Sequence, residues 1–246
     1  MILINLASTS GGAGRTSLAA SLATQLHALG RTVMLMQADP MNNLGFHLGQ
    51  TQAATTGLCQ HLLQGVALDT CLQHTGNGLP VLPFGPSSHA EQLALQRLLL
   101  EKPDRLQDVF RDDTVGKHGI VLVDLPKWPS AWCKAFFDLG DLNLLALVPD
   151  LGAVLGIDDL LPELLNARGA SYFLMNRFDS TKVLHLDVWT LCKTKLSHRL
   201  LPFYLHEDQS MPESQAAGSV LSEYAPYAQL VDDLNKLALW IDGEIQ

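Results

Sequence analysis

The sequence predicts an α/β fold in which a doubly wound, mainly parallel sheet carries helices on both faces. Three observations lead to this fold class. Short apolar runs alternate with segments of helical periodicity along most of the 246 residues. The run Gly119–Leu125 is apolar apart from one carboxylate near its end, as a parallel strand buried on both faces requires. A glycine-rich turn, residues 8–17, separates the first run from the first helix.

The remaining elements follow the same two patterns in order along the chain. The expected strands are residues 2–7, 31–38, 79–85, 119–125, 142–149, 170–175 and 199–205. The expected helices are residues 18–29, 57–63, 87–101, 104–111, 152–165, 181–195 and 226–241. Ser87 is the expected cap of the third of these helices. The length suits a single domain over residues 1–246, and no linker is expected.

Composition excludes several classes of protein. Hydrophobic residues make up 47% and charged residues 17% of the chain, as in ordinary globular proteins. The net charge of −9 disfavours general binding of nucleic acid, which needs a basic surface. We expect no signal peptide and no direct membrane insertion, because the longest apolar run, Leu142–Val148, is too short to span a bilayer. A cytoplasmic location is therefore expected, and the four cysteines are expected to be reduced.

The turn after the first strand has the residues of a phosphate-binding loop. Gly11, Gly12 and Gly14 let the backbone curl closely around an anion, and the helix start then presents free N–H groups and a positive dipole end. The hydroxyl of Thr16 stands where such loops hold Mg²⁺. The alternative is a glycine-rich turn that binds nothing.

Two carboxylates end strands that should share one edge of the sheet. Asp39 precedes Pro40 at the end of the second strand, and Asp124 ends the strand that begins at Gly119. Ligands of open α/β sheets bind at this edge. The alternatives are an Asp-Pro turn for Asp39 and a loop cap for Asp124.

The segment Ser10–Ser17 resembles the deviant phosphate loop of the MinD/ParA family of ATPases, Lys-Gly-Gly-x-Gly-Lys-Thr/Ser-Thr/Ser. Two lysines of that pattern are replaced, the first by Ser10 and the second by Arg15. The resemblance covers nearly the whole chain, with family motifs in order near residues 10, 39, 124, 176 and 206.

The resemblance implies ATP and Mg²⁺ as cofactors and assigns roles to matching residues. Asp39 corresponds to the aspartate that positions the attacking water, and Gln37 replaces the family's preceding aspartate. The implied catalytic residues are Asp39 and Asp124. The implied Mg²⁺ ligands are Thr16, Asp39 and Asp124. The implied nucleotide contacts are Gly11, Gly12, Ala13, Gly14, Arg15, Thr16, Ser17, Asn176, Arg177, His206, Glu207 and Asp208. Asn176 would read the adenine, and His206 replaces a proline of the segment over the base.

Within the family, the chain is most similar to the BcsQ/YhjQ-type accessory proteins of bacterial cellulose synthesis. The segments that carry this similarity are 82–85, 124–126, 199–202 and 206–208. It implies a homodimer, a small partner subunit and an inner-membrane cellulose synthase complex, to which the protein would be peripheral. Trp128, Trp132 and Phe136 recur every four residues after Asp124, which fits either core packing or a partner surface.

Three functions stay open at this point. The first is a nucleotide-gated assembly factor of a polysaccharide synthase, in which hydrolysis is slow or absent because Ser10 lacks a charge. The second is a partitioning or septum-positioning ATPase, which the overall charge and the acidic end Trp240–Gln246 disfavour. The third is a scaffold of the same fold that binds no nucleotide.

Overall fold

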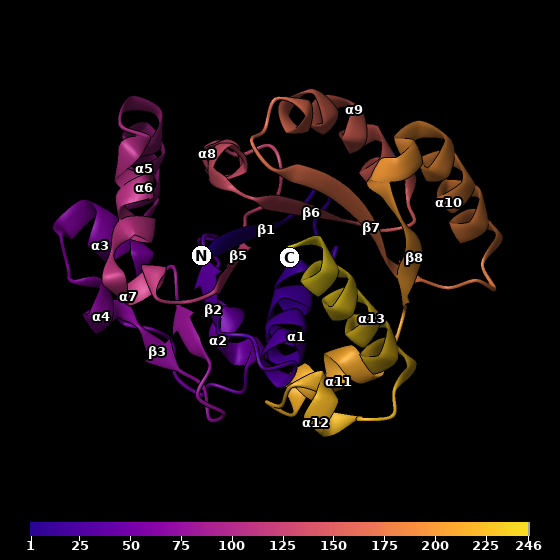
Figure 1. Cartoon of the computed structure of the whole chain (residues 1–246), viewed down its shortest axis with the longest axis horizontal. Coiled ribbons are helices and arrows are strands. Elements are labelled where there is room, and N and C mark those ends of the chain that lie inside the picture. The colour runs from indigo at the N-terminus through magenta and orange to yellow at the C-terminus, as the bar shows by residue number, and fades with distance from the viewer. Residues whose placement is uncertain (246) are drawn as a thin grey trace.

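The computed structural model describes residues 1–245, and the strands within them form one eight-stranded sheet (Figure 1). Gln246, the last residue of the expected domain and of its acidic end, lies outside the described residues. The strands are β1 (Ile2–Ser8), β2 (Val33–Gln37), β3 (Gln73–His74), β4 (Pro80–Leu82), β5 (Ile120–Asp124), β6 (Leu142–Leu147), β7 (Ala170–Phe178) and β8 (Leu200–His206). Their order in the sheet is β3-β4-β2-β5-β1-β6-β7-β8. All neighbours are parallel except β3 and β4, so the predicted fold class is confirmed.

Helices cover both faces of this sheet. On one face α1 (Arg15–Ala28) packs against α13 (Gln229–Glu244), and on the other lie α8 (Ala131–Leu139), α9 (Leu151–Leu165) and α10 (Val183–Leu196) (Figure 1). The other helices, together with the 3₁₀ turn Ser197–Arg199, lie at the ends and edges: α2 (Leu44–His47), α3 (Leu58–Gln64), α4 (Leu68–Cys71), α5 (His89–Glu101), α6 (Asp104–Arg111), α7 (Asp113–Gly116), α11 (Ser210–Ala216) and α12 (Leu221–Tyr224).

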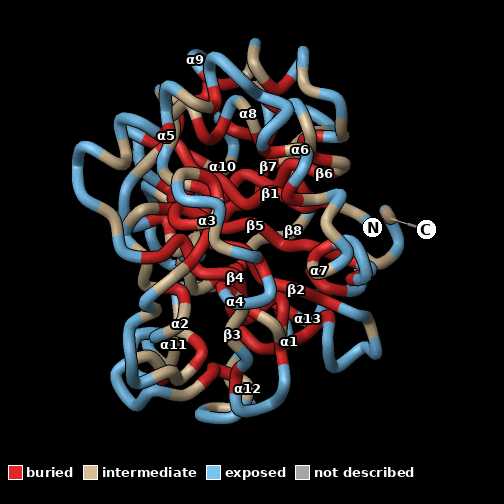
Figure 2. Tube along the Cα trace, turned by 90° about the vertical axis from the view of Figure 1, so that its left-hand side faces the viewer, coloured by how far each residue is buried: buried red, intermediate tan, exposed pale blue. Residues whose placement is uncertain are grey.

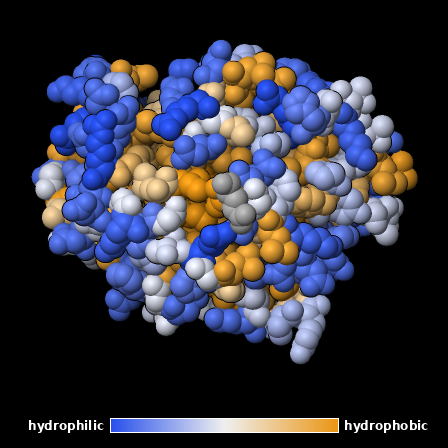
Figure 3. Space-filling view, viewed as in Figure 1, coloured by the Kyte–Doolittle hydropathy of each residue, from blue (hydrophilic) through white to orange (hydrophobic). Residues whose placement is uncertain are grey.

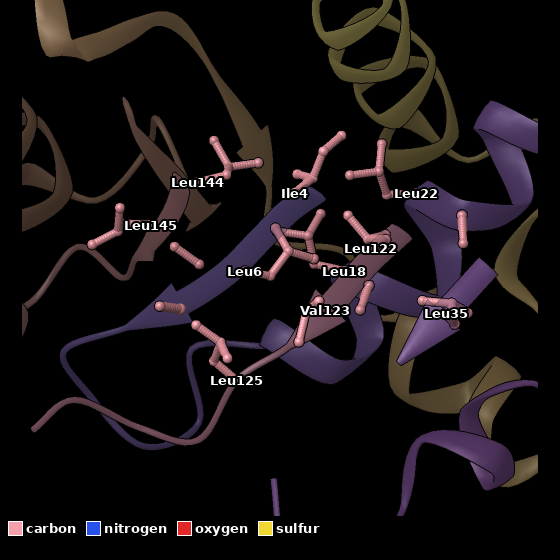
Figure 4. Close-up of a cluster of buried hydrophobic side chains, with 14 of the residues drawn as sticks. Ile4, Leu6, Leu18, Leu22, Leu35, Leu122, Val123, Leu125, Leu144 and Leu145 are labelled. Atoms are coloured by element: carbon pink, nitrogen blue, oxygen red, sulfur yellow. The ribbon is translucent and has the colours of Figure 1, made fainter. Parts of the chain in front are cut away.

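The core lies between the central strands and α1. Ile4 and Leu6 of β1, Leu122 of β5 and Leu18 and Leu22 of α1 gather there, all with at most 1% of their surface exposed (Figure 4). Figure 2 shows the central strands as continuously buried and the connecting loops as largely exposed. Burial on both faces explains why the run in β5 shows no alternation of apolar and polar residues.

Several element boundaries differ from those expected. Helix α1 begins at Arg15 rather than Leu18, because Gly14 already caps it in the left-handed conformation. Ser88 rather than Ser87 caps α5, in a reciprocal pair of hydrogen bonds with Glu91. Strand β7 continues to Phe178, so Asn176 lies inside a strand rather than after it. The short elements β3, α4, α11 and α12 were not expected, since none is long enough to show a period.

The aromatic residues after Asp124 belong mainly to the core. Trp132 is 1% exposed and Phe136 is fully buried, and Trp132 packs edge-on against Phe84. Trp128 is half-buried and precedes α8, which begins at Ala131. Of the two alternatives for this pattern, core packing therefore holds for Trp132 and Phe136, and the partner-surface alternative is wrong for them.

Over residues 1–245, no helix has both the length and the apolarity to cross a membrane. On the face drawn in Figure 3, hydrophobic residues are interspersed with hydrophilic ones. The four cysteines are buried and unpaired with one another, as expected.

Candidate functional site

The glycine-rich loop lies at the centre of the carboxyl edge of the sheet. It leaves β1, whose neighbours are β5 on one side and β6 on the other, and it enters α1. Gly14 has φ of +76°, and a Cβ at this position would come within 2.8 Å of the amide nitrogen of Asn176. Only glycine can adopt this left-handed conformation and still leave room for the Asn176 side chain. The loop therefore has the curled shape that the sequence predicts.

The absence of glycine at Thr9, where ordinary phosphate loops begin, has a packing explanation. Thr9 is 7% exposed, and its hydroxyl donates to the carbonyl of Ala153 in α9 at 3.0 Å. Gly156 of the same helix leaves room for the threonine side chain, since a Cβ there would lie 2.6 Å from Thr9 Cβ. The threonine thus fastens the start of the loop to α9.

Arg15 turns back from the loop onto the two carboxylates. Its Nη2 donates to Asp39 Oδ2 at 2.8 Å, its Nε lies 3.7 Å from Asp124 Oδ1, and its Nη1 donates to Ser8 Oγ at 3.0 Å. The hydroxyl of Thr16 donates to Asp124 Oδ2 at 2.8 Å. The structure therefore brings together the four side chains that the sequence placed around phosphate and Mg²⁺.

Asp124 is the most buried of these groups, with none of its surface exposed. Burial raises the pKa of its carboxyl to about 6, although Arg15 and the Thr16 hydrogen bond lower it. Asp39 also has a local role, since its Oδ1 accepts from the N–H of Met41 at 3.0 Å. The turn-forming alternative therefore holds for Asp39, and its role in the site stays a prediction.

These oxygens suit a hard divalent cation. Thr16, Asp39 and Asp124 have the hydroxyl and carboxylate oxygens that could hold Mg²⁺. Asp124 Oδ1 is buried and accepts no hydrogen bond from the described residues. Nowhere in residues 1–245 do three or more His, Cys, Asp or Glu side chains gather as a metal site.

A cavity opens beside the loop. It has a volume of about 590 Å³ and is bounded by the loop glycines Gly12 and Gly14, by Asn176 and by residues 205–209, 211 and 212. Asn176 is 7% exposed, and its amide donates to the carbonyl of Ala13 at 2.8 Å. The pairing of β7 with β8 shifts register between Met175 and Phe178. Such an irregularity changes the direction of the side chains between them, which include Asn176.

Charged pairs line the rim of this cavity. Arg177 donates to the carbonyl of Gly12 at 3.1 Å and to Glu207 at 3.0 Å. Lys182 donates to the other oxygen of Glu207 at 2.6 Å. Hydrogen bonds from Lys182 and then Arg177 lower the pKa of Glu207. His206 and Asp208 also line the cavity, and Asp208 Oδ1 accepts from the N–H of Ser210 near the start of α11.

The structure adds several supporting residues that the sequence did not assign to the site. Gln37 is fully buried, accepts from the N–H of Leu44 and donates to Asp124 at 3.4 Å. Asp233 of α13 accepts from both the backbone and the ring of His206, at 2.9 and 2.6 Å. Gln215 of α11 donates to Ser17 Oγ at 2.7 Å. No motif marks these partners; only Gln37 carried a signal, because it precedes Asp39 by two residues.

Comparison with known proteins gives a family. The sequence profile of the family described as "Cellulose biosynthesis protein BcsQ" matches residues 1–241. The protein of that name from Escherichia coli is 27% identical over 242 residues, which cover 98% of this chain and 94% of that protein. The one from Salmonella typhi is 28% identical and covers the same shares.

Solved structures support the same fold. The septum site-determining protein MinD from Pyrococcus horikoshii, complexed with Mg-ADP, superposes with a TM-score of 0.79 at 21% identity. The match covers 98% of this chain and 96% of that one. At this level of identity the likeness concerns the fold alone.

Proposed function

We propose that this chain, which belongs to the family of the cellulose biosynthesis protein BcsQ, is an ATP-binding assembly or regulatory factor of a bacterial cellulose synthase. It would work as a nucleotide-dependent dimer in the cytoplasm, peripheral to the inner membrane through a small partner subunit and the synthase. The observation that carries the proposal is the convergence of loop, carboxylates and cavity at one edge of the sheet.

The two halves of the site suit the two halves of ATP. The backbone from Gly11 to Thr16 would hold the phosphates, since its curl and the start of α1 favour an anion. The cavity of about 590 Å³ beside Asn176 would take the base and sugar. An amide both donates and accepts, so Asn176 could read a base edge. Mg²⁺, when bound at Thr16, Asp39 and Asp124, would neutralise phosphate charge.

Hydrolysis by this site should be slow or absent. Phosphoryl transfer depends on positive charge placed at the γ-phosphoryl oxygens. Ser10 brings no such charge, and the planar guanidinium of Arg15 does not make the same contacts as the lysine ammonium that it replaces. The ATP state would then persist as a structural state that partners recognise.

Dimerisation would bury apolar side chains around the loop. Met41, Leu151 and Leu155 are 74%, 61% and 68% exposed. Met41 lies two residues after Asp39 and donates its N–H to that carboxylate, and Leu151 follows Asp150, which lines a second hollow beside Gly11. Exposed leucines and methionines in such a position suit a partner surface. These exposed side chains, rather than the buried Trp132, would form the partner surface.

The test is light scattering combined with nucleotide binding on the same sample. We expect a monomer without nucleotide and a dimer with ATP and Mg²⁺. Leu155→Ser should keep ATP binding and weaken the dimer. Failure to bind ATP would instead favour the nucleotide-free scaffold, and a monomer with ATP bound would remove dimerisation from the proposal.

A further inference from the structure

The guanidinium of Arg15 is held inside the site by two hydrogen bonds, to Ser8 and Asp39, and by an ion pair with Asp124 in which its Nε makes no hydrogen bond. Its side chain is 12% exposed, and each end of the guanidinium contacts a different oxygen. The third partner, Ser8 Oγ, is itself fixed, because it donates to the carbonyl of Ser10 at 2.9 Å. A planar fork with this many fixed partners is pre-organised rather than freely rotating.

The two carboxylates depend on this one cation. The side chains of Asp39 and Asp124 are 12% and 0% exposed, so water can screen their charges very little. In the described part of the chain, no ion pair joins either of them to another lysine or arginine. Two buried carboxylates without a cation would repel each other strongly.

Arg15 and a divalent cation compete for the same oxygens. The guanidinium contacts Asp39 Oδ2 and lies near Asp124 Oδ1, and Mg²⁺ would need to approach such oxygens to about 2.0–2.1 Å. Two cations cannot share these atoms without strong repulsion. A free metal ion would therefore have to displace the guanidinium and break its ion pairs.

A nucleotide changes this balance. Its phosphates carry several negative charges, and a guanidinium binds phosphate oxygens with two parallel hydrogen bonds. We propose that Arg15 is an intramolecular counter-cation that keeps free divalent metal out of the site, so that Mg²⁺ enters only together with a nucleotide that draws the guanidinium away. This inference rests on the proposed nucleotide site, and it adds an order to the binding of its two ligands.

The experiment measures binding of Mn²⁺ alone, without nucleotide, by electron paramagnetic resonance. The natural chain should bind it more weakly than about 1 mM on the affinity scale. Arg15→Gln, which leaves the carboxylates unpaired, should bind Mn²⁺ at least about 10-fold more tightly. The control is Arg31→Gln, the same substitution at an ion pair with Asp242 outside the site, and it should behave as the natural chain does.

Thermal unfolding gives a second, independent readout. Arg15→Gln should melt several degrees below the natural chain without metal, and millimolar Mg²⁺ alone should restore most of the difference. The melting temperature of the natural chain should rise with Mg²⁺ only when ATP is present. This measurement needs no variant, so it remains valid if Arg15→Gln does not fold. Tight Mn²⁺ binding by the natural chain, or equal binding by Arg15→Gln, would overturn the proposal. A failure of ATP binding would leave the Mn²⁺ contrast measurable, so the two proposals can fail separately.

Discussion

The phosphate side and the base side of the site are built in opposite ways. On the phosphate side, Arg15 and Asp39 are 12% exposed and Asp124 is fully buried. On the base side, the charged pair Arg177 and Glu207 is 53% and 36% exposed. Charges in dry surroundings interact strongly, whereas exposed pairs contribute about 0–1 kcal/mol. Changes on the phosphate side should therefore have large effects and those on the base rim small ones.

The largest effect is expected at Gly14. In Gly14→Ala the new Cβ would meet Asn176 Nδ2 at 2.8 Å and would stand at a φ of +76°. The strain and the displaced amide together cost about 3 kcal/mol, so ATP affinity should fall about 150-fold. Titration calorimetry with ATP measures this change.

Gly30→Ala is the matched control for this substitution. Gly30 has a φ of +83°, and nothing lies within 4 Å of its Cβ position. The control should lose similar backbone stability but keep the ATP affinity of the natural chain. If both alanine variants bind ATP as tightly as the natural chain, the loop does not hold the nucleotide.

The sequence was informative wherever one residue type could perform a task. Gly14 was found because a left-handed backbone close to a neighbour requires glycine, and β5 was found because a doubly buried strand must be apolar. Asp39 and Asp124 were placed on one edge because parallel strands share it. The orientation of the Arg15 side chain could not be predicted, because the carboxylate that it contacts is brought close to it only by the fold.

An intermediate effect is expected at Asn176, where the two sides meet. Its amide donates to the carbonyl of Ala13, so Asn176→Ala removes both a proposed base contact and a link to the loop. The loss of one buried hydrogen bond is worth about 1–3 kcal/mol, or about 5- to 150-fold in ATP affinity. Competition between ATP and GTP measures whether preference for adenine falls as well. Equal affinity of the natural chain for ATP and GTP would contradict a base-reading role for Asn176.

The partners of His206 illustrate what lies beyond sequence reasoning. His206 stood in a recognisable segment, but Asp233, which fixes its ring, lies 27 positions later on α13. An aspartate on a helix is ordinarily taken as solvent-exposed, and only tertiary packing leaves this one 2% exposed. The short helices α11 and α12 were missed for a related reason, since packing rather than periodicity defines them.

The smallest effect is expected at Glu207. Glu207→Gln removes a negative charge that neutralises Arg177 and Lys182 at the rim. ATP affinity should rise about 2- to 5-fold at low salt, and the gain should shrink as salt screens the exposed charges. The control is Glu163→Gln, which breaks an exposed pair with Lys134 and should leave ATP affinity unchanged. A gain of the same size in both variants would mean that net charge, rather than the rim, causes it.

The central claim is that this site holds ATP without consuming it quickly, and single-turnover hydrolysis beside equilibrium binding tests it most directly. The natural chain should bind ATP and return it almost unhydrolysed. The double variant Ser10→Lys with Arg15→Lys should hydrolyse it faster, because it adds a positive charge at residue 10 and replaces the guanidinium at residue 15 with the lysine ammonium of the family pattern. Rapid turnover by the natural chain, at a rate equal to that of the double variant, would contradict the account.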